Sequence, residues 1–126
     1  MKAPKLRSIL QEHWPECVVP WLTDTVYTIP SLSDLKKAVS ELVKPDGKFQ
    51  PERNDCDDYA LHLHSAVKKW VRDNTEGFQW PFLEVFVIDR HHNMNACYTD
   101  SGLYMVEPQT GDIWPHTDEK IVMYKG

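Results

Sequence analysis

Three kinds of feature are scarce or missing in this sequence: paired cysteines, long apolar runs and an excess of positive charge. The three cysteines, Cys17, Cys56 and Cys97, are an odd number without a tight spacing, so they outline no disulfide framework. No stretch approaches the length of a membrane span, and residues 1–16 lack the apolar core of a signal peptide. We therefore expect a soluble, cytoplasmic protein whose thiols stay reduced.

The charge balance is acidic, with a formal net charge of −5. A broad nucleic-acid interface would need a basic face, so the sequence predicts no nucleic-acid partner, and it offers no membrane-binding segment either. Charged residues make up 26% and hydrophobic residues 41% of the chain, a mix typical of globular domains. Its 126 residues are enough for one hydrophobic core, so we expect a single domain over residues 1–126.

The first part of the chain predicts helices. Residues 5–14 can form a short one, and Ser31-Leu32-Ser33-Asp34 is a capping box that starts a second one, which Pro45-Asp46-Gly47 ends. A longer helix begins near Asp55, and its apolar residues recur at helical spacing and form one continuous stripe: Cys56, Tyr59, Ala60, Leu63, Ala66, Val67, Trp70 and Val71. This spacing places Cys56 in the first turn, on the face that meets the rest of the protein.

The later part of the chain predicts strands. One strand is expected early, at Thr25–Ile29, and the others follow the long helix, at residues 83–88, 94–99, 103–107 and 121–124. Asp100-Ser101-Gly102 is expected as the tight turn of a hairpin. Helices followed by an antiparallel sheet make an α+β fold.

Cys56, His92 and Glu107 have the residue types of a nucleophilic thiol site. Such a site needs a thiolate, an imidazole that holds the proton and a third group that orients the imidazole. The start of a helix favours an adjacent negative charge, and Cys56 has that location. His91-His92 begins one expected strand and Glu107 ends the next, so the order along the chain is cysteine, histidine, acid.

Three motifs carry a resemblance to a known family: residues 54–60 (NDCDDYA), 92–95 (HNMN) and 106–110 (VEPQT). Together they resemble the C-terminal papain-like protease domain of fungal agglutinins and, more distantly, bacterial transglutaminase-like cysteine proteinases. The resemblance implies a papain-like fold, with N-terminal helices packed on a small antiparallel sheet. It also implies a homodimer and a calcium-activated peptidase or isopeptidase with Cys56 as nucleophile, His92 as general base and Glu107 as orienting acid. The sugar-binding domain of the agglutinins has no counterpart here, so the resemblance implies no lectin activity.

The acidic residues around Cys56 suggest a role for a cation. Asp55, Asp57 and Asp58 would raise the pKa of the thiol, and a divalent ion near Asp58 would offset them. With the calcium dependence that the resemblance implies, the expected ligands of a Ca²⁺ or Mn²⁺ ion are Asp58, Gln109 and Asp112, which all offer oxygen atoms.

The sequence leaves two points about the histidines open. In a hairpin with Asp100 to Gly102 as its loop, Asn95 lies opposite Glu107, and His92 would need a bulge to reach the acid. His91 could also exchange roles with His92. His62 and His64 are two residues apart on a helix and do not share a face, so they predict no metal site.

Three functions compete. The first is a thiol-dependent hydrolase that acts on a peptide or protein substrate. The second is a catalytically silent binding or interaction module, such as a phage or bacterial accessory protein. The third, a zinc hydrolase that uses Cys56, His92 and Cys97, lacks the short ligand spacing of known zinc sites.

Overall fold

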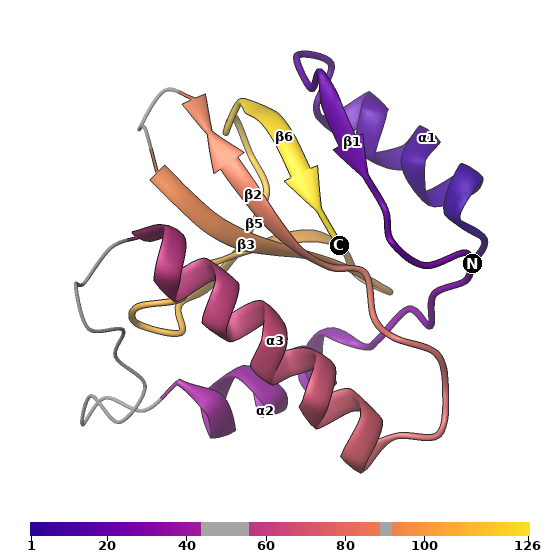
Figure 1. Ribbon diagram of the computed structural model, residues 1–126, viewed down its shortest axis with the longest axis vertical. Coiled ribbons are helices and arrows are strands. Elements are labelled where there is room, and N and C mark those ends of the chain that lie inside the picture. The colour runs from indigo at the N-terminus through magenta and orange to yellow at the C-terminus, as the bar shows by residue number, and fades with distance from the viewer. Residues whose placement is uncertain (44–55, 89–91) are drawn as a thin grey trace.

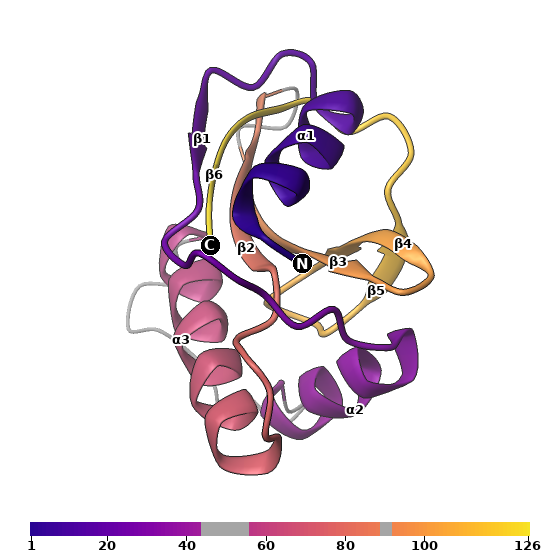
Figure 2. The same cartoon turned by 90° about the vertical axis from the view of Figure 1, so that its right-hand side faces the viewer.

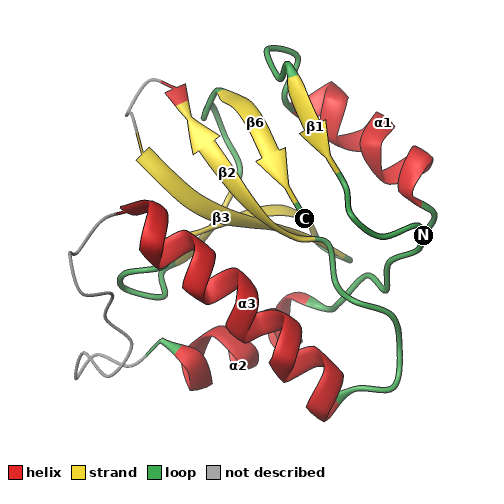
Figure 3. Ribbon diagram, in the orientation of Figure 1, coloured by secondary structure: helices red, strands yellow, loops and turns green. Residues whose placement is uncertain are grey.

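The computed structural model describes residues 1–43, 56–88 and 92–126, without the side chains of residues 56–58. Its helices are α1 (Ala3–His13), α2 (Leu32–Leu42) and α3 (Cys56–Asn74). Its strands are β1 (Val19–Trp21), β2 (Phe82–Val87), β3 (His92–Thr99), β4 (Gly102–Val106), β5 (Ile113–Pro115) and β6 (Ile121–Lys125). Figure 1 shows these elements in chain order, and Figure 3 shows the strands gathered in one sheet.

The sheet is mixed and has the strand order β1-β6-β2-β3-β4-β5. β1 pairs with β6 in parallel, and the other neighbours are antiparallel. The last strand in the sequence, β6, therefore lies between the first strand and β2.

Helices cover both faces of the sheet. Leu6 and Leu10 of α1 pack with Leu83, Val85 and Met94 on one face. On the other face, residues of α2 and α3 pack with Phe82, Cys97 and Val106. Figure 2, turned by 90°, shows α1 apart from α2 and α3. Because side chains alternate along each strand, one sheet supplies both apolar clusters.

The predicted helices α2 and α3 are confirmed. The Ser31 hydroxyl accepts a hydrogen bond from the Asp34 N–H at 3.0 Å, as a capping residue does. The apolar stripe of α3 is buried at Tyr59, Ala60, Leu63, Val67 and Val71.

The predicted fold is wrong in its arrangement. We expected N-terminal helices packed on a small antiparallel sheet of papain-like type, but the structure is mostly a six-stranded mixed sheet. α1 lies on the face opposite α2 and α3, so the helices do not form one layer.

The first strand, β1, lies at Val19–Trp21 and not at the predicted Thr25–Ile29. Within Thr25–Ile29 only Val26 makes an isolated bridge, to Lys2. Tyr27 exchanges backbone hydrogen bonds with Met1 and buries its ring, which accounts for the β-like composition of this segment. β1 contains Pro20, and a proline is tolerated there because β1 is an edge strand.

Candidate functional site

His92 and Glu107 form a polar contact at one end of the sheet. His92 begins β3, Glu107 directly follows β4, and their Nε2 and Oε2 atoms are 3.0 Å apart. Both side chains are largely buried, with 25% of His92 and 19% of Glu107 exposed. The structure therefore brings together these two members of the predicted catalytic set.

The register of the hairpin explains the contact. The turn is shorter than predicted, since Thr99 pairs with Gly102, and Asn95 lies opposite Val106 rather than Glu107. If the register continues, Glu107 lies level with Met94, two residues from His92. Residues two apart on a strand point to the same side, so no bulge is needed. Gly102 permits this turn because its φ of 114° is costly for other residues.

The turn after β4 holds the Glu107 carboxylate in place. The Glu107 N–H donates to the Asp112 carbonyl at 2.9 Å, and the Gly111 N–H donates to the Glu107 carbonyl at 2.8 Å. Gln109 donates its N–H to Oε1 of Glu107 at 3.4 Å. One carboxylate oxygen thus faces the backbone, and the other faces His92.

Cys56 is the first residue of α3, and its side chain lies outside the described part of the structure. The Asn95 side chain connects α3 to the sheet, because its Nδ2 atom donates to the Ala60 carbonyl at 3.1 Å. In Figure 1 the first turn of α3 lies at the same end of the molecule as the start of β3. The Asn95–Ala60 hydrogen bond thus joins the helix that begins at Cys56 to the strand that begins at His92. His91, the alternative base, lies outside the described residues.

The other two cysteines are not suited to chemistry. Cys97 is fully buried between α3 and the sheet, and burial raises the pKa of its thiol. Burial also raises the pKa of the Cys17 thiol, against a smaller opposing effect of a hydrogen bond with the Val19 backbone. Cys97 is five residues from His92 on one strand, about 16 Å away. The two cannot share a zinc ion.

The predicted cation site is only partly described. Gln109 and Asp112 are exposed on the turn between β4 and β5, and the side chain of Asp58 lies outside the described residues. Among the residues described, no group of three histidine, cysteine or acidic side chains could hold a metal ion. The set of Asp58, Gln109 and Asp112 stays a prediction.

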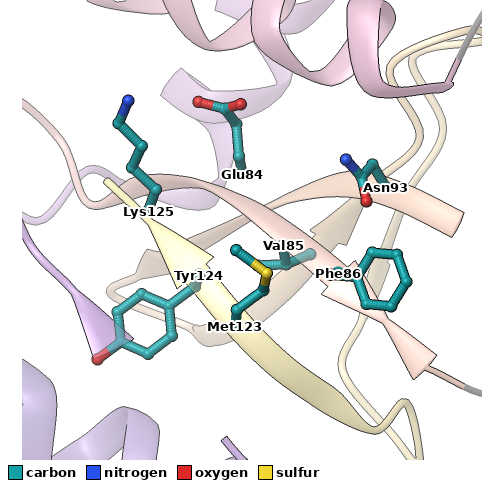
Figure 4. A pocket seen from close by; sticks show the side chains of 7 residues that line it. All are labelled: Glu84, Val85, Phe86, Asn93, Met123, Tyr124 and Lys125. Carbon is teal, nitrogen blue, oxygen red and sulfur yellow. The ribbon is translucent and has the colours of Figure 1, made fainter. Parts of the chain in front are cut away.

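A groove of about 240 Å³ lies along β2, β3 and β6. Figure 4 shows the side chains that line it: Glu84, Val85, Phe86, Asn93, Met123, Tyr124 and Lys125. Glu84 is paired with Lys125 across the strands, and Phe86 with both Met123 and Asn93. Within the described part of the chain, the buried Oδ1 atom of Asn93 finds no hydrogen-bond partner.

Glu84 connects this groove to α3. Its Oε2 atom lies 2.6 Å from Nδ1 of His64, which is only 6% exposed. Sequence reasoning missed the groove and this pair. The signal for both was Glu84 itself, a charged residue in the otherwise apolar run Leu83–Ile88.

Comparisons with known proteins find the fold but no family. No family model and no curated protein sequence matches. One solved structure, described as a PSL1a-E64 complex, matches all of this chain with 20% identity and a TM-score of 0.74. Another is Polyporus squamosus lectin bound to the human-type influenza-binding epitope Neu5Aca2-6Galb1-4GlcNAc, with 19% identity and a TM-score of 0.76.

This chain has the fold found in those structures. It spans about half the length of each, 50% and 49%. At 19–20% identity the likeness concerns the fold alone.

These comparisons contradict the predicted identity. The motifs around Cys56, His92 and Glu107 implied a papain-like cysteine protease domain without lectin character. No protease family model matches, and a lectin shares the fold. The classification as a papain-like hydrolase is therefore replaced by a likeness to a lectin structure.

The expectations about partners have a mixed outcome. None of the described helices combines the length and apolar character needed to cross a membrane. A peptide substrate finds no support in the comparisons, and a carbohydrate appears in one of them.

Proposed function

We propose that this chain is a binding module that holds a carbohydrate in the groove along β2, β3 and β6. The observation that carries the proposal is the lining of the groove. Glu84, Asn93 and Lys125 offer a carboxylate, an amide and an ammonium group beside the apolar side chains of Phe86 and Met123. A ligand site of this kind combines apolar walls with a few fixed polar groups.

The chemistry of the groove suits a sugar. Amide and carboxylate groups can exchange hydrogen bonds with hydroxyl groups, and Asn93 has a buried oxygen without a partner in the described structure. The Phe86 ring can pack against the C–H face of a sugar ring. The likeness to a lectin that binds a sialylated glycan supports the same ligand class.

Calorimetric titration with that glycan, Neu5Aca2-6Galb1-4GlcNAc, and with unsialylated oligosaccharides tests the proposal. We expect binding that Phe86→Ala and Asn93→Ala each weaken by up to about tenfold, because each removes a ligand contact worth about 1 kcal/mol. Phe78→Ala is the matched control, since Phe78 is 62% exposed and does not line the groove. No binding at millimolar concentration, or equal loss in all three variants, would reject the groove as a glycan site.

A second candidate function is thiol chemistry at Cys56, and the 3.0 Å contact between His92 and Glu107 favours it. An ionised carboxylate only accepts hydrogen bonds, so Nε2 of His92 must carry the hydrogen of this contact. In the neutral imidazole, Nδ1 is then free to accept a proton from a thiol. Cys56 would act as nucleophile, His92 as base and Glu107 as the group that orients His92.

Alkylation by iodoacetamide at pH 6.5 separates the two functions. If His92 activates the thiol, Cys56 is alkylated fast in the wild type and at least about tenfold more slowly in His92→Ala. His13→Ala is the control, because His13 is exposed on α1. Equal rates of Cys56 alkylation in the wild type, His92→Ala and His13→Ala would reject the thiol chemistry and leave only the binding function.

A further inference from the structure

Asn95 is a fully buried polar residue in the middle of β3, with an exposed fraction of 0%. Its amide nitrogen makes two hydrogen bonds, one to the Ala60 carbonyl of α3 at 3.1 Å and one to the Leu83 carbonyl of β2 at 3.2 Å. A side-chain amide has two N–H groups, so both donors of Asn95 are used. The first hydrogen bond connects Asn95 to α3, and the second connects it to β2.

The position of this link matters for the site. Cys56 is four residues before Ala60, about 6 Å along the helix axis. His92 is three residues before Asn95, about 10 Å along the strand. A helix that slides on the sheet would therefore change the separation between the Cys56 position and the His92–Glu107 pair.

The apolar contacts around the link are less sensitive to a small shift of the helix along its axis than a hydrogen bond is. Ala60, Leu63 and Val67 are buried against the sheet, and burial of this kind is non-directional. A hydrogen bond depends steeply on distance and angle. A second polar contact between α3 and the sheet is the His64–Glu84 pair, one turn further along the helix.

We propose that Asn95 is a positioning residue, which fixes the start of α3 relative to the His92–Glu107 pair. It acts through α3 and not on a ligand. This inference deepens the second candidate function, thiol chemistry at Cys56. It rests on that function only for the alkylation measurement.

The test compares Asn95→Ala with Thr99→Val. Thr99 is also buried in β3, and its hydroxyl donates to the Gly102 carbonyl at 2.9 Å, within the turn between β3 and β4. Both variants lose a buried hydrogen bond, so general destabilisation affects both. Circular dichroism confirms that each variant is folded.

The first readout is the pH profile of Cys56 alkylation. We expect Asn95→Ala to move the midpoint towards that of a free thiol, with a rate at pH 6.5 lower by about tenfold or more, and Thr99→Val to keep the wild-type midpoint. Where the wild-type midpoint lies below that of a free thiol, the same midpoint in Asn95→Ala would overturn the proposal.

The second readout is hydrogen exchange of the amides of residues 59–64, and it does not depend on thiol chemistry. Asn95→Ala should speed this exchange about tenfold or more relative to Thr99→Val, because the link at Ala60 is lost. If wild-type Cys56 behaves as an ordinary thiol, the second candidate function fails, and the exchange measurement alone decides the role of Asn95. Equal exchange in the two variants would then reject it.

Discussion

Nε2 of His92 lies 3.0 Å from Oε2 of Glu107, and a backbone N–H, that of Gln109, approaches the other oxygen of the same carboxylate. The carboxylate is thus held from two sides, by the turn after β4 and by the first residue of β3. An imidazole held through one nitrogen has a fixed tautomer and a fixed ring orientation. The contact therefore orients the His92 ring at the start of β3.

Glu107→Gln should lower the rate of Cys56 alkylation at pH 6.5 while it preserves the fold. Glutamine keeps the size of the side chain but lacks the charge that stabilises a protonated His92, so we expect a loss between about 10-fold and 10²-fold. Glu76→Gln, a change at an exposed residue, is the control. A Glu107→Gln protein that reacts at the wild-type rate would remove Glu107 from the site.

The three cysteines should differ in reactivity. Peptide mapping after brief iodoacetamide treatment at pH 6.5 should find Cys56 labelled first, Cys17 slowly and Cys97 only after unfolding. Burial raises the pKa of both Cys17 and Cys97, and Cys97 is also inaccessible. Labelling of Cys97 in the native protein, or protection of Cys56, would contradict this order.

Glu84→Gln should lower the free energy of unfolding. The 2.6 Å contact with His64 is largely buried, and its loss should cost about 1–3 kcal/mol. Urea denaturation measures the change, with Glu76→Gln again as the exposed control. An unchanged denaturation midpoint would show that the contact between α3 and β2 contributes nothing to stability.

Glu119 should make stability depend on acid pH. Burial raises the pKa of its carboxyl, but hydrogen bonds from the Thr117 N–H and the Trp114 indole, together with smaller effects, outweigh burial and hold the pKa below its usual value. A group with a lowered folded-state pKa stabilises the fold above its unfolded pKa, about 4.3, and this contribution is lost as the pH falls through the folded value.

Melting temperatures measured between pH 7 and pH 3 check this prediction. The wild type should lose stability on acidification more steeply than Glu119→Gln, which has no carboxyl to titrate. Parallel curves for the two proteins would assign the acid sensitivity to other groups.

The sequence predicted local elements better than their arrangement. The stripe of α3 and the capping box at Ser31 identified helices because periodicity and capping are local signals. The edge strands were missed because β1 and β5 are three residues long and are defined by their partners. The composition of Thr25–Ile29 favoured a strand, but the Tyr27 side chain is instead buried in the apolar cluster between α1 and the sheet.

The site was predictable where it depends on residue type and order. His92 and Glu107 were named from the sequence, whereas their contact depends on a one-residue difference in the hairpin register. The groove was not predictable, because it combines residues of three strands that only the sheet order brings together. The implied protease identity depended on short motifs, which do not determine a function.

The location of β6 in the sheet has a kinetic consequence. β1 has no sheet partner until residues 121–125 arrive, because β6 separates it from β2. Pairing Val19 with Met123 closes a loop that contains most of the sequence, and contacts of such long range slow folding. The pairing of β1 should therefore form late in folding, and a ribosome-bound chain that lacks residues 121–125 should keep β1 without its sheet partner.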